Sequence, residues 1–148
     1  MKLLPIYKFF AGSQTEFTKP FRENEQLFKQ AQHFWNKLEN SSLVIILICV
    51  VLGISLAAYY YLLYNNMPGR HYTPKHWIIF LVSTFILVFA VTLGFEYIAV
   101  PPKLDGSFIL ELRIALGNAV YATFLFLLIS WMWCQFNLPT NAYRLIKI

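Results

Sequence analysis

Residues 43–64 read LVIILICVVLGISLAAYYYLLY, an uncharged run that decides the fold class. A helix of about 20 apolar residues is long enough to cross the hydrocarbon core of a bilayer. Two more runs of this kind follow: residues 77–98, whose one charged residue is Glu96, and residues 114–136, which have none. Since a lone strand would leave backbone groups unpaired in lipid, each run is predicted to be a helix. We therefore expect an all-α integral membrane protein with three transmembrane helices, the third beginning early to cover 108–136.

The overall composition supports the same class. Of the 148 residues, 58% are hydrophobic and only 13% are charged, against about 25% charged in soluble domains. This composition excludes a soluble globular enzyme and a disordered chain. The net charge of +5 comes from basic residues outside the apolar runs. It favours attraction to anionic lipid headgroups over nucleic-acid binding.

The segment before the first run is predicted to be an amphipathic interfacial helix over about 23–40, within an N-terminal region of residues 1–42. Its apolar residues recur at helical spacing and form one stripe. They are Leu27, Phe28, Ala31, Phe34, Trp35 and Leu38. Such a face fits a helix that lies in the headgroup layer, and it fits equally a helix that docks in a partner's groove. Asn40-Ser41-Ser42 is expected to separate this helix from the first span, and residues 1–19 are expected to be a disordered or partner-contacting arm.

Small residues four apart occur in each span of the 43–136 region. The pairs are Gly53 and Ala57, Ala90 and Gly94, and Ala115 and Ala119. Small residues at this spacing let helix backbones approach closely in lipid. We therefore expect a packed bundle that associates with copies of itself or with other subunits. The tail, residues 137–148, is too short for a further domain.

Two polar residues inside the spans are candidates for an intramembrane polar site. Glu96 is expected to reach headgroup water or to pair with Lys103 or Arg113, the alternative being a pore-lining or proton-handling role. Asn118 is expected to form an interhelical hydrogen bond, the alternative being a permeation path. Both alternatives remain open at this point.

No pattern for chemistry was found beyond these two residues. Of the histidines, His33, His71 and His76, none lies deep in a span, so haem ligation within the membrane has no ligands. Cys49 and Cys134 fall inside apolar runs and are predicted to be small buried hydrophobes. Phosphate-binding, hydrolase and metalloprotease motifs are missing from the sequence. We expect no enzyme activity, no catalytic, metal-binding or cofactor-binding residues, and no small-molecule substrate.

These observations leave two functional hypotheses. In the first, the chain is a non-catalytic anchoring and assembly subunit of a multiprotein membrane complex, for example an envelope-spanning secretion machine. In the second, copies form a ring that conducts ions or disrupts the membrane. A pore needs a polar stripe, and the spans offer only a thin one, which favours the first hypothesis. The excess of Lys and Arg before the first span and in the second loop predicts a cytoplasmic N-terminus and an outside C-terminus, in a bacterial inner membrane.

Overall fold

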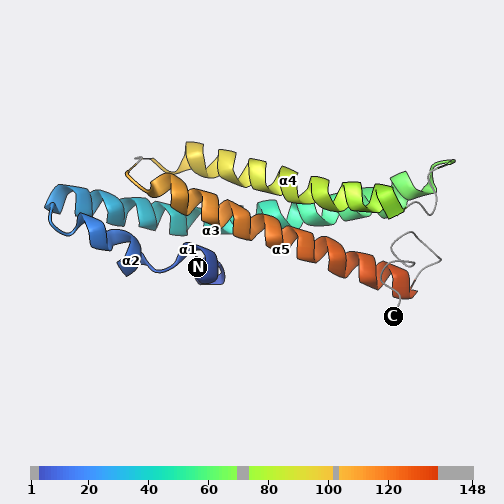
Figure 1. The fold of residues 1–148 in the computed structure, drawn as a ribbon, viewed down its shortest axis with the longest axis horizontal. Coiled ribbons are helices and arrows are strands. Elements are labelled where there is room, and N and C mark those ends of the chain that lie inside the picture. Colours follow the sequence, from blue (N-terminus) through green and yellow to red (C-terminus); the bar gives the residue numbers. More distant parts are fainter. Residues whose placement is uncertain (1–3, 70–73, 102–103, 137–148) are drawn as a thin grey trace. The chain divides into compact units, whose positions relative to one another are not determined.

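The computed structural model describes residues 4–69, 74–101 and 104–136, and 90% of these residues are helical. No described residue belongs to a strand. Three helices are long and apolar enough to cross a membrane, as the sequence predicts. They are α3, which begins at Glu25, α4 (Pro74–Ala99) and α5 (Ser107–Phe136) (Figure 1). The predicted tail, residues 137–148, lies outside the described residues.

Helix α3 covers Glu25–Ala58 and continues through a π-helical turn, Tyr59–Leu63, and a 3-10 turn, Tyr64–Asn66. Its start is fixed by Asn24, whose side-chain oxygen accepts hydrogen bonds from two backbone N–H groups of the first turn. The 42 residues of this helical stretch are about twice the number needed to cross a bilayer.

The structure differs from the break predicted at Asn40-Ser41-Ser42. All three residues are helical, so the predicted interfacial segment is the first part of α3. The Ser42 hydroxyl donates to the Glu39 carbonyl at 2.6 Å. A serine that bonds back to its own helix satisfies its polar group without ending the helix.

Residues 4–21, which we call the N-terminal arm, form short helices, so of the two sequence expectations the disordered arm is wrong and the partner-contacting arm stays a prediction. Its elements are η1 (Leu4–Tyr7), α1 (Lys8–Ala11), α2 (Gln14–Thr18) and η2 (Lys19–Phe21). Gly12, with φ of +73°, reverses the chain after α1. Ser13 and Glu16 then form a capping box, in which each side chain accepts from the backbone N–H of the other.

The described chain groups into two compact units. Unit 1 contains the described residues up to Leu47 together with Phe89–Asn118, and unit 2 contains Ile48–Val88 together with the described residues from Ala119 onward. Each of the three long helices contributes residues to both units. We describe the two units separately.

In unit 1, the N-terminal arm packs on part of the apolar stripe predicted on residues 27–38. The Phe17 ring packs against Phe34 and Trp35, with ring centroids 5.6 and 6.1 Å apart. Ala31, Phe34, Trp35 and Leu38 are buried, Phe28 is half-buried and Leu27 is exposed. The stripe is therefore a surface on which the chain folds back, and α2 lies beside the first part of α3 (Figure 1).

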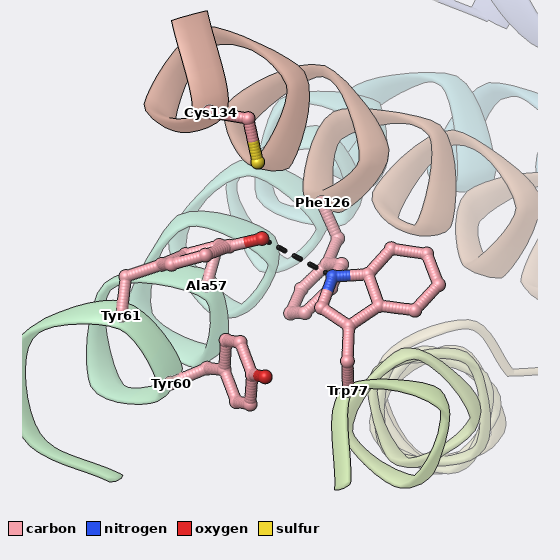
Figure 2. Close-up of a cluster of buried hydrophobic side chains, with 6 residues drawn as sticks. All are labelled: Ala57, Tyr60, Tyr61, Trp77, Phe126 and Cys134. Atoms are coloured by element: carbon pink, nitrogen blue, oxygen red, sulfur yellow. Dashed lines mark hydrogen bonds between the residues drawn. The ribbon is translucent and has the colours of Figure 1, made fainter. Parts of the chain in front are cut away.

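Unit 2 is held together by an aromatic cluster drawn in Figure 2. Tyr60 and Tyr61, from the π-helical turn of α3, face Trp77 of α4 and Phe126 of α5. The Trp77 indole N–H lies 3.1 Å from the Tyr61 hydroxyl and 3.2 Å from that of Ser130. Each aromatic pair adds about 0.5–1.5 kcal/mol beyond the area that it buries. The indole bond satisfies the one polar atom of Trp77.

Cys49 and Cys134 are both buried in unit 2, which confirms the prediction made for them.

The capping box makes the N-terminal arm sensitive to acid. The backbone N–H of Ser13, and then its side chain, hold the pKa of the Glu16 carboxyl below its ordinary value of 4.5. Because the folded form has the lower pKa, the stabilisation is complete above about pH 4.5 and is lost as pH falls through the folded value. We expect the chemical shifts of the α2 amides to titrate together with the Glu16 carboxyl carbon in an NMR experiment.

Glu16→Gln is the matched control for this titration, because glutamine at the same position still accepts from the Ser13 N–H but carries no charge. The acid transition of α2 should disappear in that variant. Ser13→Ala should move the pKa of Glu16 upward. An acid transition that is the same in Glu16→Gln and in the unaltered protein would contradict this account.

Candidate functional site

The strongest polar centre of unit 1 is the side-chain amide of Asn118, which is fully buried in α5. Its oxygen accepts a hydrogen bond from the Tyr7 hydroxyl at 2.6 Å. Its nitrogen donates to the Ile45 carbonyl of α3 at 3.0 Å and to the Thr92 hydroxyl of α4 at 2.7 Å. One amide therefore joins the N-terminal arm and all three long helices.

The orientation of this amide follows from its partners. A backbone carbonyl can only accept, so the Asn118 nitrogen must face Ile45, and the oxygen is then left for Tyr7. Both amide hydrogens and one of the two oxygen lone pairs are used within the chain. The expected interhelical hydrogen bond of Asn118 is thus present, with a partner on each of two helices.

The Thr92 hydroxyl is the acceptor that α4 contributes to this network. It is fully buried on α4, one helical turn from Glu96 and on the same face. A buried hydroxyl or amide without a hydrogen bond costs several kcal/mol in an apolar environment. The three side chains Tyr7, Thr92 and Asn118 therefore stabilise one another's burial.

Gly117 explains how the N-terminal arm comes close enough for this contact. A Cβ atom built at Gly117 would lie 2.7 Å from Cδ2 of Phe10 and 2.9 Å from Cγ. Only a residue without a side chain leaves room for the Phe10 ring against α5. Tyr7, one turn earlier in the arm, then reaches Asn118, the next residue of α5.

Two carboxyl groups lie on the faces of α4 and α5 that carry this network. Glu96 follows Thr92 by four residues, and Glu111 precedes Asn118 by seven, which is two helical turns. Both side chains are fully buried. Glu96 therefore does not reach headgroup water as the sequence suggests, and Lys103, one of its two expected partners, lies outside the described residues.

Buried carboxyl groups are costly and mark a functional candidate by default. Thr92 and Asn118, on the same two faces, bond helix to helix. Within residues 4–69, 74–101 and 104–136, no three His, Cys, Asp or Glu side chains gather where they could hold a metal ion. His33 is exposed, His76 packs edge-on against Tyr64 with centroids 5.4 Å apart, and His71 lies outside the described residues.

Two of the three predicted small-residue pairs are buried. In unit 2, a Cβ atom at Gly53 would lie 3.4 Å from the Ala122 carbonyl oxygen of α5, and Ala57 is fully buried in the aromatic cluster. Ala115 and Ala119 of α5 are fully buried as well.

The third pair, Ala90 and Gly94, is exposed on α4, and nothing lies within 4 Å of a Cβ atom built at Gly94. This pair makes no packing contact within the described part of one copy, and association through it stays a prediction.

Sequence reasoning found Asn118 and Glu96 but missed Tyr7, Thr92 and Glu111. Tyr7 lies in an arm without a regular apolar pattern, and its contact joins residues 111 positions apart. The spacing Ser13-x-x-Glu16 is a capping-box signature and could have revealed that the arm is helical. Thr92 and Glu111 could have been found by marking every polar residue on the faces of Asn118 and Glu96.

No model of a protein family, no curated protein and no solved structure matches this chain. The arguments for function therefore rest on the residues and their geometry.

The Tyr7–Asn118 bond gives a direct test of the network. We expect Tyr7→Phe to lower the free energy of unfolding by about 1–2 kcal/mol, because the Asn118 oxygen loses its buried donor. Tyr59→Phe is the control: Tyr59 is exposed and its ring stacks on Phe80, a contact that phenylalanine keeps. Thermal or denaturant unfolding in detergent measures both variants, and equal losses of stability would contradict the proposed role of Tyr7.

The close contact at Gly117 can be tested with alanine substitutions. Gly117→Ala should push Phe10 away and increase hydrogen exchange of the amides in residues 4–21. Gly94→Ala adds the same methyl group to α4, where it meets nothing within 4 Å, and should leave the exchange of the arm unchanged. An arm that stays equally protected in Gly117→Ala would show that the Phe10 contact does not hold it.

Proposed function

We propose that this chain is a non-catalytic membrane-anchoring and assembly subunit of a larger multiprotein membrane complex, such as an envelope-spanning secretion machine. In this proposal α3, α4 and α5 cross the membrane, and the partners are the lipid bilayer and other subunits or further copies of the chain. The proposed location is a bacterial inner membrane, and the excess of Lys and Arg before the first span and in the second loop favours a cytoplasmic N-terminus.

The observation that carries the proposal is the direction of the polar side chains in the apolar helices. Asn118 and Thr92 are buried and bonded to each other in unit 1, and Ser130 is buried and accepts from Trp77 in unit 2. Large apolar side chains occupy outward positions of the same helices, for example Ile86 of α4 and Phe124 of α5, which are 59% and 65% exposed.

This distribution favours a subunit over a pore. A conducting ring needs polar groups on the surface that each copy turns toward the lumen. Asn118, Thr92 and Ser130 are engaged inside a single copy, so these groups are not available to line the lumen of a ring. An anchored subunit needs only an apolar outer surface that lipid or a neighbouring helix can cover.

The assembly contact is assigned to these outward apolar faces within the membrane. The stripe on residues 27–38, expected to be an interfacial or a partner-docking face, is mostly buried in unit 1, where Phe17 packs on Phe34 and Trp35. Of its six residues Leu27 alone is exposed. A partner that used the whole stripe would have to displace Phe17 first.

Site-specific photo-crosslinking in the native host tests the assignment. A photoreactive phenylalanine analogue at Ile86 or Phe124 should give adducts with one identified membrane protein, which also co-purifies with the unaltered chain in a fixed ratio. The control is the same analogue at Phe126, which is fully buried and should react only within the chain. Adducts made solely with further copies of this chain would contradict a multiprotein complex.

A dye-leak assay distinguishes the proposed subunit from the alternative of a pore. Purified protein in liposomes should leave a trapped dye inside, and Asn118→Leu should leave the vesicles equally tight. Dye release by the unaltered protein that changes in Asn118→Leu or Glu96→Gln would overturn the proposal in favour of a pore.

A further inference from the structure

A hollow of about 180 Å³ in unit 1 is not explained by the polar network or by the proposed anchoring role. It lies between the α1–α2 turn and the start of α5. Glu16 and Arg113 line it with opposite charges, Phe17 and Ile109 line it with apolar surface, and the glycines Gly12 and Gly106 line it without side chains.

Both charges are available to a ligand. Glu16 is exposed, and its pKa is lowered by the hydrogen bonds from Ser13, so it stays ionised at neutral pH. Arg113 is exposed, and a guanidinium group is charged at every physiological pH. The hollow is thus lined by a carboxylate, a guanidinium and apolar surface, which is the pattern required by a zwitterionic amphiphile.

The position of the hollow indicates where that amphiphile would come from. Arg113 directly precedes Ile114, the first residue of the apolar run of α5. If α5 crosses the bilayer as proposed above, Arg113 lies at the level of the lipid headgroups. The exposed side chains of Phe108, Ile109 and Leu112 then offer apolar surface to acyl chains beside the hollow.

We propose that this hollow binds the headgroup of an aminophospholipid of the phosphatidylethanolamine type, an inference that rests on the proposed membrane insertion. The Arg113 guanidinium holds the phosphate through paired hydrogen bonds, and the Glu16 carboxylate accepts from the primary ammonium group. A choline headgroup cannot donate to Glu16, and an anionic headgroup without an amine is repelled by it.

The size and the backbone of the hollow fit this assignment. Its volume is below the roughly 300 Å³ at which pockets for drug-sized ligands begin, so it admits a headgroup and excludes larger metabolites. Gly12 and Gly106 have φ of +73° and +80°, which favours glycine at both positions, so no side chain projects into the hollow from either residue. A Cβ atom at Gly12 would lie 2.7 Å from the Glu16 carboxylate, so a larger residue there would displace that carboxylate.

Lipid retention measured by native mass spectrometry tests the proposal. The full chain is incorporated in nanodiscs that contain equal amounts of phosphatidylethanolamine, phosphatidylcholine and phosphatidylglycerol, and is then released. We expect phosphatidylethanolamine to be retained about fivefold over either of the others, the ratio that a partly exposed ion pair supplies.

Two variants test the charges of the hollow one at a time, and a third is a control. Glu16→Gln keeps the cap of α2 and should abolish the preference for phosphatidylethanolamine over phosphatidylglycerol. Arg113→Gln should reduce retention of all three lipids. Arg22→Gln removes an exposed arginine outside the hollow and should change nothing.

The outcomes distinguish the site from the proposed function. A chain that fails to enter nanodiscs would overturn the proposed membrane insertion itself. A chain that inserts but retains lipids equally in Glu16→Gln, Arg113→Gln and Arg22→Gln would overturn the headgroup site alone. Displacement of the lipid by equimolar soluble glycerophosphoethanolamine would show that the site recognises a free phosphoamine and would overturn the lipid assignment.

Discussion

The hydrogen bonds of one side-chain amide, that of Asn118, set the arrangement of unit 1. An amide buried among apolar helices costs several kcal/mol unless its hydrogens and oxygen find partners. Here the partners come from three other segments of the chain, the arm, α3 and α4, so the cost is removed only when the arm and all three helices are in register. A sliding or rotated helix would leave the amide unsatisfied, whereas apolar contacts alone would tolerate such a shift.

The inward direction of these buried polar side chains also leaves apolar faces on the outside of the helices. With Asn118, Thr92 and Ser130 directed inward, Ile, Leu, Val and Phe occupy many of the exposed positions of the apolar runs. Unit 2 repeats the arrangement with the Trp77 indole, which bonds to Tyr61 and Ser130 in the middle of an aromatic cluster. A chain built in this way presents its neighbours with shape and apolar surface, which suits a subunit that is held among other helices.

Much of the fold could be read from the sequence, because long uncharged runs admit few solutions. The three long helices and the burial of both cysteines follow from length and composition, and Asn118 was expected to bond between helices. The docking of the arm on α5 could not be predicted in this way, because Tyr7 and Phe10 form no periodic pattern and their partners lie more than a hundred residues away. Four of the six residues of the stripe on 27–38 are buried, but a stripe identifies an apolar face and does not say which surface covers it. The burial of Glu96 likewise depends on neighbours that local sequence does not specify.

The bond from Tyr7 to Asn118 also orders events during synthesis. The two residues are 111 positions apart, so the N-terminal arm has no docking site until the first part of α5, up to Asn118, has been translated. At about 5–20 residues per second, the arm waits roughly 6–20 s with its tyrosine and phenylalanines uncovered. During that interval chaperones and insertion factors have access to the arm, and its final register is locked only after Asn118 has been made.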